Sequence, residues 1–131
     1  MIVLDTHAWL WWLHDPARLS VRARQAIVRA ERDDGMKVSV ISVWEVATKC
    51  ALGKLTLPMR IDVWFEHARS YPGIVIEPVV AEDALASACL PGTFHKDPAD
   101  RLIVALARRL QVGLVTADRL IRLYPHVETI W

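Results

Sequence analysis

The sequence has few cysteines and almost no net charge. Its two cysteines, Cys50 and Cys89, form neither a C-x-x-C pair nor a zinc-ligand spacing, which excludes a cysteine-based redox motif or zinc site. We expect both to be small buried thiols. The formal net charge of +1 excludes a global basic field that draws a protein onto nucleic acid without specificity. Any contact with nucleic acid must therefore be local.

Long apolar runs are also missing. The longest run near the N-terminus, residues 8–13, is far shorter than the roughly 20 residues that a membrane span needs. The first residues include the acidic Asp5 but no basic region and no small-residue cleavage site, so we expect no signal peptide. We expect a soluble, cytoplasmic protein that has no contact with a membrane.

The chain has a length that suits one hydrophobic core. With 131 residues it is too short for two cores, and we expect a single domain over residues 1–131. Short β-branched runs alternate with longer helical patterns, which is typical of an α/β domain with a parallel sheet. We predict strands at 2–4, 37–41, 74–79, 114–118 and 127–131, and helices at 6–15, 21–34, 43–52, 60–70, 81–90 and 98–110, the last ended by Gly113.

Four acidic residues interrupt apolar segments at equivalent places in this pattern. Asp5 follows the first strand, and Asp118 follows the fourth. Glu45 lies at the start of the helix after the second strand, and Asp100 lies in the first turn of the longest helix. The carboxyl ends of parallel strands and the N-termini of the following helices share one edge of such a sheet. We expect the four side chains to converge there.

A convergent set of carboxylates predicts a metal site. Without cations the carboxylates repel one another and raise their own pKa values, so the cluster implies a divalent ion. Oxygen ligands suit Mg²⁺ or Mn²⁺, which complete their shells with water and phosphate, and this points to phosphoryl chemistry. Each acid also has a local alternative. Asp5 can cap a helix, Asp100 can favour a helix dipole, Asp118 can be a turn residue, and Glu45 can complete a capping box with Ser42.

Several segments also resemble a known family. A buried strand that ends in Asp-Thr, "ISVWEVATKCALGKLTLP" from residue 41, "HKDPADRLIVALA" at 95–107 and "LVTAD" at 114–118 together resemble the PIN-domain ribonucleases, specifically VapC-type toxins of bacterial type II toxin–antitoxin pairs. The similarity covers essentially the whole chain, in order. It implies a three-layer α/β/α PIN-like domain with a central parallel sheet, Mg²⁺- or Mn²⁺-dependent cleavage of RNA, a homodimer, and inhibition by a cognate antitoxin.

The resemblance also implies roles for individual residues. Thr116, a hydroxyl residue before the fourth acid, is expected to hold a water molecule of the site, and Thr6 is a supporting residue beside the first acid. Asp97 is a second acid near Asp100; we assign Asp97 mainly to the helix N-cap and Asp100 to the metal. The resemblance places the catalytic and metal-binding acids at Asp5, Glu45, Asp100 and Asp118.

Other side chains allow both a structural and a functional interpretation. His95 precedes the acidic turn and is the best of the histidines as a phosphate contact. The arginines of the second helix form either a solvated face or a path for phosphates. The helical pair at about 43–70 carries apolar residues that we expect at a subunit interface, with part of the surface available to an antitoxin: Trp44, Leu52, Leu55, Ile61, Trp64 and Phe65.

The alternative to an enzyme is a non-catalytic α/β binding module whose acidic rim docks a basic partner. A phosphoaspartate phosphatase, which also has acids at this rim, needs a second aspartate two residues after Asp5. That position is His7, which argues against the phosphatase. The leading hypothesis is therefore a metal-dependent endoribonuclease.

Overall fold

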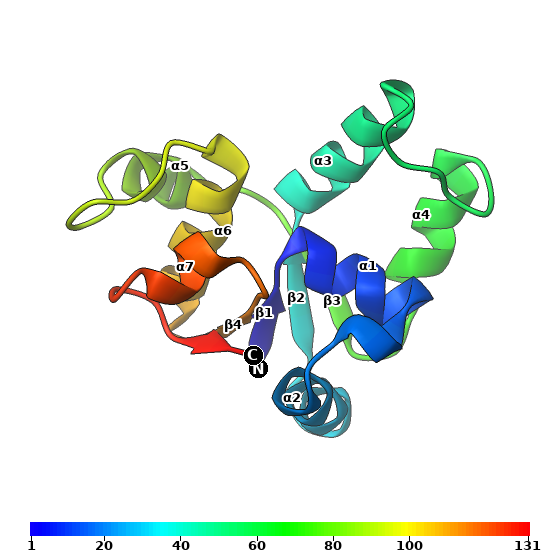
Figure 1. The fold of residues 1–131 in the computed structure, drawn as a ribbon, viewed down its shortest axis with the longest axis horizontal. Helices are drawn as coiled ribbons and strands as arrows, with labels where there is room; N and C mark the ends of the chain where they lie inside the picture. Colours follow the sequence, from blue (N-terminus) through cyan, green and yellow to red (C-terminus); the bar gives the residue numbers. More distant parts are fainter.

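The computed structural model describes residues 1–131 and contains a five-stranded, fully parallel sheet of order β3-β2-β1-β4-β5 (Figure 1). The predicted α/β class is confirmed. The strands are β1 (Ile2–Leu4), β2 (Met36–Ser39), β3 (Ile74–Glu77), β4 (Gly113–Val115) and β5 (Thr129–Ile130). The helices are α1 (Thr6–His14), α2 (Val21–Arg32), α3 (Val40–Ala51), α4 (Ile61–Arg69), α5 (Ala81–Ala88), α6 (Pro98–Leu110) and α7 (Arg119–Leu123), with a 3₁₀ turn at Pro16–Arg18.

Helices cover both faces of the sheet, which gives the three layers expected. Successive side chains of a strand point to opposite faces, and β1 shows this alternation: Ile2 and Leu4 join a core with α1, α2 and α4. Val3 joins a second core, formed with α6 and α7. All three side chains are buried, so β1 is the centre of the molecule.

The strand order creates a switch point between β1 and β4. The chain adds β2 and β3 on one side of β1 and then crosses to place β4 and β5 on the other. Ligands of open α/β sheets bind beside the carboxyl ends of the strands at such a switch point. Asp5 directly follows β1, and Asp118 begins α7 after β4, so the fold positions these two acids beside the switch point.

The helix that carries Glu45 begins earlier than predicted, at Val40 and not at Val43. Ser39 is its N-cap, since the Ser39 side chain accepts a hydrogen bond of 3.2 Å from the Ile41 N–H. The alternative interpretation of Ser42 and Glu45 as a capping box is therefore wrong, because both residues lie inside the helix. Ser42 is fully buried, and the role of Glu45 must come from a tertiary contact.

The longest helix begins as predicted and ends differently. Asp97 is its N-cap and accepts a hydrogen bond of 3.0 Å from the Asp100 N–H. Gly113 does not end it; the helix stops at Leu110, where Gln111 adopts the left-handed conformation with a φ of 55°. Gly113 instead opens β4, where a Cβ atom would lie 2.7 Å from Ile130 Cδ1. The other predicted elements occur, with ends shifted by a few residues at most.

Only part of the apolar surface predicted for the helical pair at about 43–70, α3 and α4, is exposed. Trp64 is 2% exposed, packs edge-on against Trp9 with ring centroids 5.1 Å apart, and donates from Nε1 to His14 Nε2 at 2.8 Å. Its assignment to an interface is wrong, because it belongs to the core of the subunit. Trp44 and Leu52 are 59% and 63% exposed, so the predicted interface now depends on α3.

No helix has both the length and the hydropathy that crossing a membrane requires. Cys50 is half-buried, and Cys89 is exposed just after α5, so the prediction of a buried thiol is wrong for Cys89.

Candidate active site

Asp5 is a buried carboxylate held at the junction of β1 and α1. Its side chain accepts a hydrogen bond of 2.8 Å from the Ala8 N–H, and the residue is only 5% exposed. Burial raises the pKa of Asp5 above its ordinary value, while hydrogen bonds from the Thr116 hydroxyl and the Ala8 N–H lower it in part. Asp5 is thus the helix cap, as one of its two interpretations predicted, and its role in a metal site stays a prediction.

Thr116 connects Asp5 with Asp118. Its buried hydroxyl oxygen accepts a hydrogen bond of 3.0 Å from the Asp118 N–H, and the hydroxyl donates to Asp5. Asp118 caps α7 by accepting a hydrogen bond of 3.0 Å from the Ile121 N–H. The role predicted for Thr116, holding a water molecule, stays a prediction, and its observed hydrogen bonds fix the two acids relative to each other.

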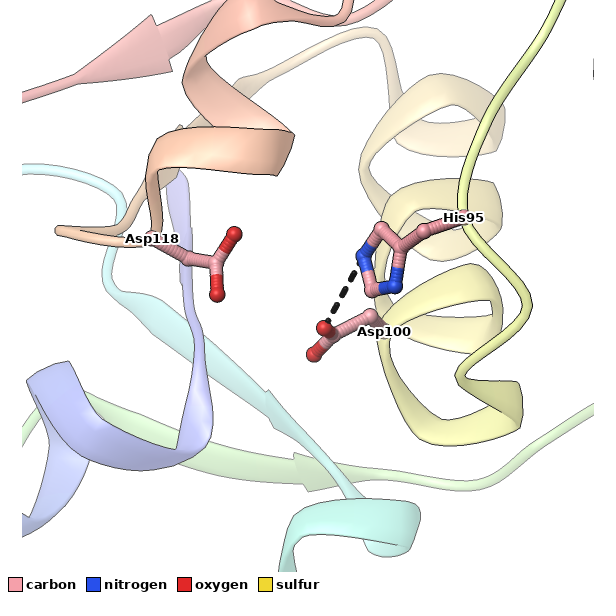
Figure 2. A group of neighbouring side chains, drawn as sticks. All are labelled: His95, Asp100 and Asp118. Atoms are coloured by element: carbon pink, nitrogen blue, oxygen red, sulfur yellow. Dashed lines mark ion pairs between the residues drawn. The ribbon is translucent and has the colours of Figure 1, made fainter.

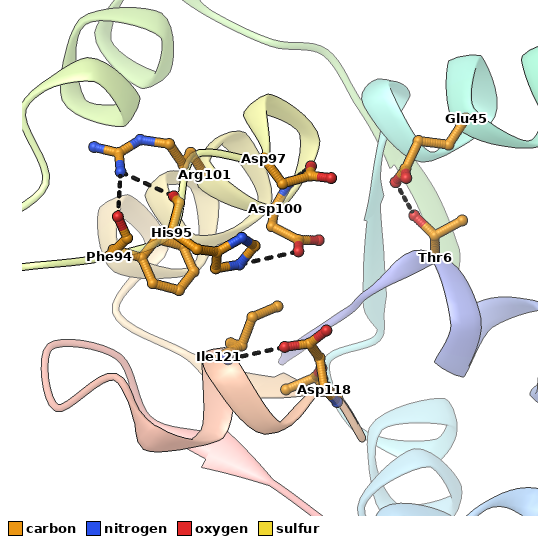
Figure 3. Close-up of polar contacts among 10 residues, drawn as sticks. Thr6, Glu45, Phe94, His95, Asp97, Asp100, Arg101, Asp118 and Ile121 are labelled. Carbon is orange, nitrogen blue, oxygen red and sulfur yellow. Dashed lines mark hydrogen bonds and ion pairs between the residues drawn. The ribbon is translucent and has the colours of Figure 1, made fainter.

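Glu45 is oriented by Thr6, from the first turn of α1. Thr6 Oγ1 lies 2.6 Å from Glu45 Oε1 and 2.8 Å from Ser42 Oγ (Figure 3). A carboxylate only accepts hydrogen bonds and a hydroxyl has one proton, so Thr6 donates to Glu45 and Ser42 donates to Thr6. The supporting role given to Thr6 therefore has a structural basis.

Asp100 lies where the charges of the other acids meet. It is half-buried in the first turn of α6, and its pKa is raised to about 7. Burial is the largest cause, followed by repulsion from Asp97, Asp118, Glu45 and Asp5. The acids predicted to converge thus lie close enough for their negative charges to raise the pKa of Asp100. In Figure 3 the side chains of Asp97, Asp118 and Glu45 lie around Asp100.

His95 belongs to the site more closely than the sequence indicated. Its Nε2 lies 3.2 Å from Asp100 Oδ2, and ligand atoms of His95, Asp100 and Asp118 all lie within 4.8 Å of one another (Figure 2). Histidine spacing gave no signal, because the partners of His95 are acids on other elements. The available signal was the position of His95 directly before the acidic turn.

No lysine or arginine neutralises this cluster. None of the five carboxylates, Asp97 included, forms an ion pair with either residue type. Arg101, next to Asp100 in sequence, donates to the carbonyl oxygens of Ser87, Phe94 and His95. The positive helix N-termini offset part of the charge. Uncompensated carboxylates beside one imidazole fit a divalent ion such as Mg²⁺ or Mn²⁺.

The comparisons with known proteins agree with this geometry. The sequence profile of the PIN domain matches residues 2–126. The chain belongs to the PIN-domain family. This PIN domain is also 38% identical to ribonuclease VapC22 from Mycobacterium tuberculosis, over 99% of the chain and 98% of that protein. The resemblance to the VapC type, seen in the sequence, is confirmed.

Solved structures share the fold of this PIN domain. One is VapBC2 from Rickettsia felis bound to a DNA fragment from its promoter, with a TM-score of 0.70, 15% identity, and coverage of 98% of this chain and 97% of that one. Another is VapC20 from Mycobacterium tuberculosis, a sarcin–ricin loop cleaving toxin, with a TM-score of 0.66, 17% identity, and full coverage of both chains. At these identities the likeness shows the PIN fold.

Proposed function

We propose that this PIN domain is the toxin of a toxin–antitoxin pair and that it hydrolyses internal phosphodiester bonds of RNA with the help of Mg²⁺ or Mn²⁺. The identity to ribonuclease VapC22 along the whole chain supports the reaction. The VapBC complexes that share its fold support a cognate antitoxin as the partner. The observation that carries the metal requirement is the cluster of carboxylates without a lysine or arginine partner around Asp100, whose pKa is about 7.

Asp5, Asp100 and Asp118 are the residues that would hold the ion, with Glu45 beside them. A divalent ion, when bound, supplies positive charge for the scissile phosphate and makes water a better nucleophile. Asp5 and Asp118 keep fixed orientations, because each caps a helix and both bond to Thr116. The site is thus built before RNA arrives, which avoids the cost of reorganising it during the reaction.

Glu45 is the best candidate for handling a proton. Its Oε1 accepts the hydrogen bond from Thr6, and Oε2 has no hydrogen bond within the protein. That second oxygen is available to orient a water molecule and accept its proton as the water attacks phosphorus. Positioned general bases typically contribute about 10² to 10⁴-fold to a rate, so Glu45 is expected to be catalytic in addition to any contact with the ion.

The test is RNA cleavage by wild type and Glu45→Gln in Mn²⁺ or Mg²⁺. Glutamine still accepts from Thr6 but lacks the negative charge, so the rate should fall by at least about 100-fold while thermal stability is kept. Glu31→Gln is the matched control, because Glu31 is an exposed residue of α2, and it should cleave like wild type. Near wild-type cleavage by Glu45→Gln would contradict the assignment.

The binding-module alternative gives a different result in the same assay. If the acids only docked a basic partner, wild type would cleave no RNA at any concentration of either ion. Asp5→Asn, which removes the most buried acid of the set, separates the two functions further. It should abolish cleavage under the proposed function and change nothing in the assay under the alternative.

A further inference from the structure

His95 presents to the acidic cluster a buried nitrogen that forms no hydrogen bond within the protein. Its Nε2 is buried, and although it lies 3.2 Å from Asp100 Oδ2, it lacks a partner with hydrogen-bond geometry. Buried polar atoms almost always have a hydrogen-bond partner, so an orphaned one requires an explanation. Figure 2 shows the imidazole directed from the α5–α6 loop toward Asp100, with Asp118 on the far side. The nitrogen therefore faces the place where an ion would lie.

The spacing of these three side chains suits a common ion. One ligand atom each from His95, Asp100 and Asp118 lies within 4.8 Å of the other two. Ligands on opposite sides of an octahedral ion are about 4 Å apart, because each is about 2.1 Å from the ion. Small side-chain rotations would bring all three atoms into one shell. The donor set would then hold a nitrogen as well as oxygens.

The loop that carries His95 is held firmly in place. Arg101 donates from Nε to the Ser87 carbonyl at 2.7 Å. It also donates from Nη1 to the carbonyls of Phe94 and His95 at 3.2 and 3.1 Å (Figure 3). The Phe94 ring packs against the His95 ring and against Tyr124, with centroids 4.4 and 4.6 Å apart. The position of the imidazole is thus set by α6 and by the second core.

We propose that His95 supplies a nitrogen ligand, through Nε2, to the divalent ion held by Asp100 and Asp118, and that this ligand makes the site prefer Mn²⁺ to Mg²⁺. The proposal rests on the metal requirement of the proposed function. Imidazole is a good ligand for transition metals, whereas Mg²⁺ takes oxygen ligands. Carboxylates bind both ions, so the part of the preference for Mn²⁺ that is lost with His95 is the property that distinguishes the histidine.

The experiment measures Mn²⁺ binding to the metal-free protein, without RNA. Pulsed electron paramagnetic resonance of the wild-type complex should show a directly coordinated nitrogen, and His95→Gln should lose that signal. The concentration of free Mn²⁺ in the same titrations gives the affinity, which should be at least about tenfold weaker in His95→Gln than in wild type. The affinity for Mg²⁺, measured by competition with Mn²⁺, should change less. His7→Gln is the matched control: it removes an exposed imidazole two positions from Asp5 and should keep the nitrogen signal.

The outcomes separate this inference from the proposed function. A wild-type complex that binds Mn²⁺ without a coordinated nitrogen overturns the role of His95 and leaves the metal requirement standing. A nitrogen signal that persists in His95→Gln also overturns it. Failure of wild type to bind Mn²⁺ at millimolar concentration overturns both. The decisive spectrum is that of wild type, so the result does not depend on the folding of any variant.

Discussion

Thr6 Oγ1 lies 2.6 Å from Glu45 Oε1, joining the first turn of α1 to the middle of α3. Thr6 is the residue after Asp5. The segment that positions one acid at the end of β1 therefore also orients a second acid, Glu45, which lies 39 residues after Thr6. The contact replaces the capping box as the explanation of Glu45. The orientation of this glutamate is thus set by a tertiary hydrogen bond and not by capping of its own helix.

Thr6→Val tests that relationship. Valine has nearly the shape of threonine but gives Glu45 no hydrogen bond and leaves the buried Ser42 hydroxyl without its acceptor. We expect a loss of about 1 to 3 kcal/mol in the free energy of unfolding. The cleavage rate should fall by about 10 to 100-fold, the usual effect of removing a residue that orients a ligand. Urea denaturation and RNA cleavage measure the two effects.

Thr6→Ser is the control, because it keeps the hydroxyl. It should retain most of the activity. If Thr6→Val cleaves as fast as Thr6→Ser, the hydrogen bond does not orient Glu45.

The features that the sequence predicted well are those with local causes. Asp97 before Pro98 marks the start of α6 through neighbouring residues alone, and β1 is a short apolar run before a capping acid. For Glu45 the sequence also offered a local alternative, a capping box with the serine three residues earlier. That alternative is wrong, because the partner of Glu45 is Thr6, which is remote in sequence. The prediction that Trp64 lies at a subunit interface was wrong for a similar reason. Helical spacing does not reveal which face of a helix another element covers, and Trp9 covers this one.

Variants of Asp97 and Asp100 should distinguish the capping role of the first residue from the metal-binding role of the second. Asp97 caps α6, so Asp97→Ala should lose on the order of 1 kcal/mol of stability, while Asp97→Asn, with an amide that caps equally well, should lose almost none. Asp97→Asn should also keep substantial cleavage activity. Asp100→Asn should fold and be inactive, since an amide binds Mg²⁺ much less well than a carboxylate. Thermal melts and cleavage assays decide, and an inactive Asp97→Asn beside an active Asp100→Asn reverses the assignment.

Asp100 should make the stability of the metal-free protein depend on pH. Its pKa is raised from 3.8 to about 7 on folding, so between these values the folded state binds more protons than the unfolded state. The free energy of unfolding therefore falls as the pH rises through this window. Asp100→Asn lacks the effect. In excess chelator, the free energy of unfolding of Asp100→Asn relative to that of wild type should therefore rise by on the order of 2 kcal/mol from pH 5 to pH 8. If urea denaturation gives the same difference in stability between variant and wild type at pH 5 and at pH 8, the pKa of Asp100 is not raised on folding.

Trp44 should anchor the predicted homodimer. It is 59% exposed on α3, and exposed tryptophans at interfaces often contribute more than about 2 kcal/mol to binding. Wild type should sediment as a dimer and Trp44→Glu as a folded monomer. Leu85→Glu, at a leucine 73% exposed on α5, is the control and should remain dimeric. A dimeric Trp44→Glu protein would place the interface elsewhere.

The most direct measurement is RNA cleavage by the antitoxin-free wild-type protein, first in excess chelator and then after Mn²⁺ or Mg²⁺ is added back. The acids around Asp100 have no lysine or arginine partner, so we predict that a divalent ion supplies the positive charge that the reaction needs. Cleavage should stop in chelator and return with either ion, at lower concentrations of Mn²⁺ than of Mg²⁺. Cleavage at an unchanged rate in excess chelator would contradict the metal-dependent mechanism.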